Sequence, residues 1–70
     1  MEELVEVYPN EMLAQLWAGI LDQEGIRSMV KPQYGGYGAW GRDVFIPHAL
    51  YVLGENIDRA RAIIKEIDGP

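Results

Sequence analysis

The 70-residue sequence contains no cysteine and no threonine, and it has one serine and one histidine. Without cysteine, disulfides and thiolate metal sites are excluded, although both are common supports of small domains. His48 alone cannot build a metal site, and Ser28 has no neighbours typical of a catalytic nucleophile. An acid–base pair could be formed by His48 with Asp43 or with a tyrosine. The simpler interpretation is that His48 is an ordinary turn residue. We therefore expect no enzyme, no metal and no cofactor.

Long apolar runs and an excess of basic residues are also absent. No run approaches the roughly 20 apolar residues that a membrane-spanning helix needs. The start, Met1-Glu2-Glu3-Leu4, is acidic where a signal peptide is basic. The net charge of −5 disfavours binding to phosphate backbones. We expect a cytoplasmic prokaryotic protein that binds neither membranes nor nucleic acids.

The charges that are present are unevenly distributed. Residues 1–25 contain six acidic and no basic residues, whereas Arg27, Lys31 and Arg42 stand against a single acidic residue within residues 26–54. A domain of this size rarely gains more than roughly 3–5 kcal/mol of stability from its core, which leaves self-association as an available support. An acidic first helix of one copy that meets basic residues of another predicts a salt-sensitive contact.

Apolar periodicity predicts a single α+β domain over residues 1–70 with the element order β-α-β-β-β-α. The predicted strands cover residues 4–8, 26–31, 44–46 and 50–53. A short turn at His48-Ala49 makes the last two strands a hairpin.

Two amphipathic helices complete the predicted domain. The first begins at the N-cap Asn10 and ends at Gly25, and the second begins with Asn56 or Glu55 near its cap. Their apolar stripes are Met12, Leu13, Leu16, Trp17, Ile20 and Leu21 in the first helix, and Ile57, Ala60, Ile63, Ile64 and Ile67 in the second. With one stripe each, the helices cover only one face of an antiparallel or mixed sheet, which gives an open sandwich.

The other face of the sheet follows from the two-residue period of strands. The residues expected to face the helices are Val5, Val7, Ile26, Ser28, Val30, Val44, Ile46, Leu50 and Val52. The uncovered face then carries five large side chains, those of Tyr8, Met29, Phe45, Tyr51 and Leu53. Because such a patch marks an interface, we expect self-association through it, with a dimer favoured. The alternative is that the loop described next folds back and covers it.

Residues 32–42 form a loop rich in glycine and aromatic residues. Its run Gly36–Gly41 matches the G-x-G-x-x-G pattern, but it lies between two strands rather than before a helix, so the match is coincidental. A plain hairpin loop is one interpretation. The other is a site for a protein partner or a small anionic or aromatic ligand, in which aromatic rings stack and flanking cations attract negative charge. Its residues are Lys31, Tyr34, Tyr37, Trp40 and Arg42.

Several short motifs are shared with a known family. They are Val7-Tyr8, Asn10-Glu11, Ala14, Leu21 and Glu24-Gly25-Ile26 in the first part, and Leu50-Tyr51-Val52 with residues 58–64 in the second. With these motifs the chain resembles a family of small prokaryotic domains of unknown function, labelled putative prokaryotic signal-transducing protein. Their fold is similar to the ferredoxin-like arrangement of PII-type regulators. The leading hypothesis is a non-enzymatic regulatory or protein-interaction module that self-associates, and the alternative is a small-molecule sensor.

Overall fold

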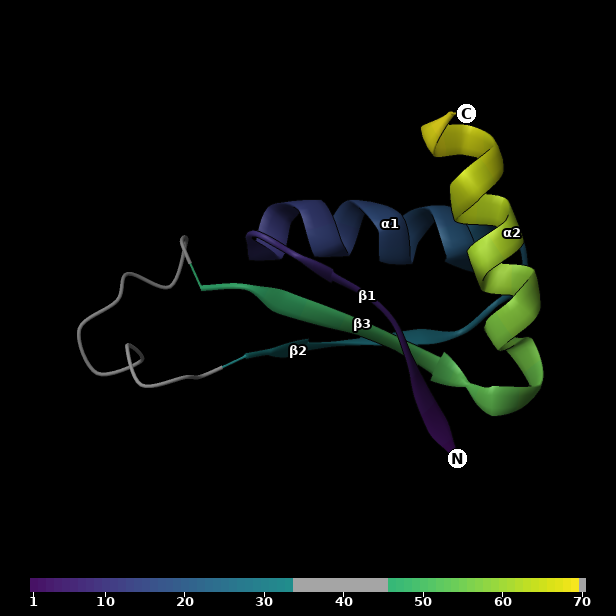
Figure 1. The fold of residues 1–70 in the computed structure, drawn as a ribbon, viewed down its shortest axis with the longest axis horizontal. Coiled ribbons are helices and arrows are strands. Elements are labelled where there is room, and N and C mark those ends of the chain that lie inside the picture. Colours follow the sequence, from purple (N-terminus) through teal and green to yellow (C-terminus); the bar gives the residue numbers. More distant parts are fainter. Residues whose placement is uncertain (34–45, 70) are drawn as a thin grey trace.

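A computed structural model describes residues 1–33 and 46–69 of the chain. In order along the chain, its elements are β1 (Glu2–Tyr8), α1 (Glu11–Gln23), β2 (Ser28–Pro32), β3 (His48–Leu53), the short 3-10 helix η2 (Gly54–Asn56) and α2 (Ile57–Asp68). Figure 1 shows the two helices on one side of the three strands. Neither helix in this described part is long and apolar enough to cross a membrane.

The three strands form one antiparallel sheet in the order β1-β3-β2. Since both outer strands run antiparallel to β3, β1 and β2 run parallel to each other and α1 connects them across the sheet. This arrangement confirms the predicted α+β fold class and is consistent with a ferredoxin-like order. The predicted strand at 44–46 falls mostly outside the described residues.

Both helices pack on the same face of the sheet (Figure 1). Helix α1 lies over β2 and β3, whereas α2 lies mainly against β1. The largest fully buried side chains come from the end of α1, the connection between α1 and β2, and β3: Leu21, Ile26, Leu50 and Val52. The main core is therefore a single layer between the sheet and the two helices, and on the opposite sheet face Ala49 is also fully buried.

The boundaries of α1 confirm the capping signals in the sequence. The side-chain Oδ1 of Asn10 accepts a hydrogen bond from the Leu13 N–H at 2.8 Å. At the other end the Ile26 N–H donates to the Leu21 carbonyl at 2.9 Å, across Gly25 with φ of +80°. Glycine adopts this left-handed conformation without steric cost, which turns the chain sharply into β2.

The turn predicted at His48-Ala49 is wrong. Both residues belong to β3, where His48 pairs with Tyr8 and Pro32, and Ala49 pairs with Val7 and Lys31. The hydrogen-bonding partners on both sides of β3 extend the strand to these residues, which local propensity cannot foresee. The structure thus has a longer central strand than the sequence suggested.

The face assignments in β1 are also partly wrong. Val7 was expected in the core but is 45% exposed, whereas Tyr8 was expected on the uncovered face but is 7% exposed. The pairing of β1 with β3 shifts between Leu4 and Glu6, which leaves Val5 as an extra residue at a bulge. One extra residue in a strand moves every later side chain to the other face. Val5 and Tyr8 therefore both face the helices.

Helix α1 is rotated relative to its predicted stripe. Met12 is 83% exposed and Leu16 is 56% exposed, although both were expected in the core. The buried positions are Ala14, Trp17 and Leu21. The Trp17 ring stacks on Tyr8, with centroids 6.4 Å apart and ring planes 13° apart. The side chain of Ala14 is small enough to let the helix approach the sheet closely, so the helix turns toward this line of residues.

Candidate functional site

The sheet face opposite the helices is covered by no other element in the described part of the chain (Figure 1). We call it the open face. In β3, Tyr51 lies between the core residues Leu50 and Val52, so strand alternation directs it to the open face. The strand partners of Tyr51 share that face, and so do the residues two positions before and after Tyr51 in β3 and the strand partners of those residues. The open face consists of Glu2, Leu4, Val7, Met29, Lys31, Ala49, Tyr51 and Leu53.

Apolar side chains dominate the open face. Leu4, Val7, Met29 and Leu53 are between 42% and 47% exposed, and together they surround Tyr51, which is half-buried. The direct strand partners of Tyr51 are Leu4 on β1 and Met29 on β2. A contiguous group of large apolar side chains on a sheet face is the usual composition of a protein–protein contact.

A salt bridge crosses this face above Tyr51. The Lys31 Nζ lies 2.9 Å from the Glu2 Oε1, and it lies 4.9 Å from the centroid of the Tyr51 ring. The hydrogen bond to the Glu2 carboxylate, and then its charge, raise the pKa of Lys31. Exposed pairs of this kind contribute little to stability and are screened by salt. Their effect here is to place one acid and one base at fixed positions on the apolar face.

A shallow hollow of about 280 Å³ extends the open face between β2 and β3. Its apolar wall is formed by Met29, Tyr51 and Leu53, while Glu2 and Arg27 bring one charge of each sign to its rim. The hollow is large enough for a side chain of a partner protein rather than for a drug-sized ligand.

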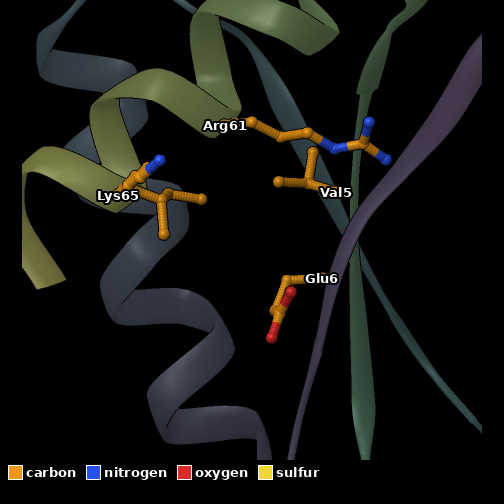
Figure 2. Close-up of a pocket in the computed structure, with 5 residues that line it drawn as sticks. Val5, Glu6, Arg61 and Lys65 are labelled. Atoms are coloured by element: carbon orange, nitrogen blue, oxygen red, sulfur yellow. The ribbon is translucent and has the colours of Figure 1, made fainter. Parts of the chain in front are cut away.

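A second hollow, of about 230 Å³, lies between β1 and α2 on the helical side of the sheet. Figure 2 shows Arg61 reaching from α2 toward β1 across Val5, with Glu6 and Lys65 below it. The Arg61 Nη2 donates a hydrogen bond to the Leu4 carbonyl at 3.2 Å, which ties α2 to β1. This hollow was not foreseen from the sequence, because its residues come from opposite ends of the chain.

Tyr8 and His48 lie side by side on the helical side of the sheet, at the paired ends of β1 and β3. The Tyr8 hydroxyl is buried without a hydrogen-bond partner in the described structure. Burial raises the pKa of Tyr8 to about 12, and the negative charges of Glu6 and Asp68 act in the same direction. His48 is 6% exposed and its Nδ1 lies 2.7 Å from the Ile46 carbonyl oxygen. Both residues are therefore core residues rather than exposed site residues.

The predicted self-association residues fall into three groups. Met29, Tyr51 and Leu53 lie together on the open face, whereas Tyr8 is in the core because of the bulge in β1. Phe45 lies outside the described residues. Leu4 and Val7 complete the open face, although neither was predicted there from the sequence. The adjacent apolar pair Leu4-Val5 is the signal that could have found Leu4, since two neighbouring strand residues cannot both face one core. Val7 lies on the open face only because of the bulge at Val5.

The predicted loop site is represented only by Lys31 in the described structure. Its other members, Tyr34, Tyr37, Trp40 and Arg42, lie outside the described residues, so the ligand or partner site there stays a prediction. Lys31 itself is engaged with Glu2 on the open face. Among the described residues, no three potential metal ligands come together.

Comparison with known proteins identifies a matching family. A family model described as "Putative prokaryotic signal transducing protein" matches residues 1–68. No curated protein and no solved structure matches the chain significantly. Because the family model spans nearly the whole chain, the strands, both helices and the open face all lie within the matched region. The chain therefore belongs to this family, described as putative prokaryotic signal transducing proteins.

Proposed function

We propose that the protein is a non-enzymatic regulatory module that self-associates through the open face. The observation that carries this proposal is the group of four large apolar side chains, Leu4, Val7, Met29 and Leu53, each between 42% and 47% exposed around Tyr51. Burying them against a second copy removes their apolar surface from water, at about 25 cal/mol per Å². The family description supports a role in signalling.

The charges on the open face suit contact between two identical copies. A two-fold dimer presents the same surface from both sides, so each residue must meet a complementary one. Glu2 and Lys31 come from opposite outer strands of the open face, and within one copy their side chains pair at 2.9 Å above Tyr51. A two-fold rotation can place Glu2 of one copy beside Lys31 of the other without like charges meeting. Salt would weaken the ion pairs between the two copies but would leave the apolar contacts between them in place.

The substitution Met29→Glu tests this proposal. It places a charge within the apolar group of the proposed contact, so we expect the dissociation constant of the dimer to rise by roughly a hundredfold or more. Sedimentation velocity over a concentration series measures the effect. Met12→Glu is the matched control, because Met12 is 83% exposed on α1, away from the open face.

Two outcomes would contradict the proposal. One is a wild-type protein that stays monomeric at the highest concentration reached in low salt. The other is a dimer that Met12→Glu disrupts as strongly as Met29→Glu does, which would move the contact to the helical side. Circular dichroism of both variants shows whether each retains the fold.

A further inference from the structure

The hollow between β1 and α2 brings together charges of both signs over an apolar floor. Arg61 and Lys65 line it from α2, and Glu6 lines it from β1 (Figure 2). Its floor is formed by Val5, which is 8% exposed, and by Ile64, which packs against the core. One hollow therefore offers two positive groups, one negative group and an apolar surface.

These charged groups do not neutralise one another. In the described part of the chain the only ion pair joins Glu2 and Lys31, so neither Arg61 nor Lys65 is paired with Glu6. Arg61 uses one N–H of Nη2 for the Leu4 carbonyl, and a guanidinium has five N–H donors. The remaining donors are held in place by that anchor and are available to a ligand. Arginine in such a position suits a planar carboxylate.

The charge pattern selects one class of ligand. A simple anion would be attracted by Arg61 and Lys65 but repelled by Glu6. A simple cation would be attracted by Glu6 but repelled by Arg61 and Lys65. A molecule with a carboxylate at one end and an ammonium close to it satisfies all three groups. The volume of about 230 Å³ lies below the roughly 300–1,000 Å³ of pockets for drug-sized ligands, which favours a molecule of amino-acid size.

We propose that this hollow binds a free α-amino acid with an apolar side chain. Its carboxylate meets Arg61 and Lys65, its ammonium meets Glu6, and its side chain lies on Val5 and Ile64. Such a ligand bridges β1 and α2, two elements that the Arg61 hydrogen bond already joins. This site is on the helical side of the sheet and does not depend on self-association through the open face.

The test is a titration of the full chain with L-leucine, followed by ¹H–¹⁵N chemical shifts in low salt. We expect saturable shifts at the amides of the hollow residues. Acetate and methylammonium, which each carry one of the two charges, are expected to bind at least roughly tenfold more weakly. Glu6→Gln and Lys65→Gln are each expected to weaken L-leucine binding by roughly tenfold or more. Glu2→Gln and Lys31→Gln are matched controls on the open face and should leave binding unchanged.

Two results would overturn this inference. The first is the absence of saturable shifts at the hollow residues with L-leucine, L-valine, L-methionine and L-phenylalanine. The second is a pair of observations: acetate binds the wild type as tightly as L-leucine does, and both bind the Glu6→Gln variant more tightly than the wild type. The hollow would then be a site for anions in general. A monomeric Met29→Glu variant that still binds L-leucine would separate this result from the self-association proposal.

Discussion

Leu21→Ala is expected to unfold most of the protein at room temperature. Leu21 is fully buried in the core between α1 and the sheet. Replacing a buried leucine by alanine costs about 2.7–5 kcal/mol, since it removes apolar contacts and leaves a cavity. A core of this size supplies only roughly 3–5 kcal/mol in total, so the loss is comparable with the whole stability. Urea denaturation followed by circular dichroism measures it.

Leu16→Ala is the matched control for that prediction. It is the same chemical change in the same helix, but Leu16 is 56% exposed. Alanine also favours the helix slightly more than leucine, so we expect a change within about 0.5 kcal/mol. Equal losses from both substitutions would show that the helix presents the wider stripe predicted from the sequence, and would contradict the rotation of α1 described above.

The second large effect concerns alkaline pH and Tyr8. The pKa of Tyr8 is raised from 10.0 to about 12, chiefly because its hydroxyl is buried. The unfolded chain therefore releases this proton at lower pH than the folded chain does. The contribution of protonated Tyr8 to the free energy of unfolding is fully present below pH 10, and it is lost as the pH rises toward about 12. Two pKa units correspond to roughly 3 kcal/mol in full, of which roughly 2 kcal/mol is lost by pH 12.

Comparison of the wild type with Tyr8→Phe isolates that contribution. Other groups titrate in both proteins, so the difference between their free energies of unfolding reports on Tyr8 alone. We expect the wild type to lose roughly 2 kcal/mol more than the variant between pH 9 and 12. At neutral pH we expect the variant to be at least as stable, because phenylalanine buries no hydroxyl without a partner. Parallel curves for the two proteins would count against the burial of Tyr8.

The elements that local signals specify were predicted well. Asn10 caps α1 and Gly25 ends it, as their side-chain chemistry and backbone freedom indicate. The α2 stripe is correct near its start, where Ile57 and Ala60 are buried, but Ile67 near its end is 55% exposed. The last turn of α2 reaches beyond the sheet. The apolar pattern of the α2 sequence therefore continues to Ile67, although the described core has already ended there.

The candidate site was only half predictable. Alternation within β2 and β3 placed Met29, Tyr51 and Leu53 on one face, because no bulge interrupts the pairing between those two strands. In β1 the same rule failed after the bulge, so Val7 and Tyr8 were each assigned to the wrong face. A bulge depends on the pairing with β3, and that pairing is absent from the sequence of β1 itself.

By itself, the sequence determined the fold class, the caps of α1 and the existence of an apolar surface beyond the core. Those features depend on composition, short-range hydrogen bonds and periodicity, which a chain carries locally. Only the tertiary structure decided which residues form the open face and the hollow of Glu6, Arg61 and Lys65. Such sites depend on strand register and on contacts between residues as far apart as Leu4 and Arg61, which no local pattern encodes.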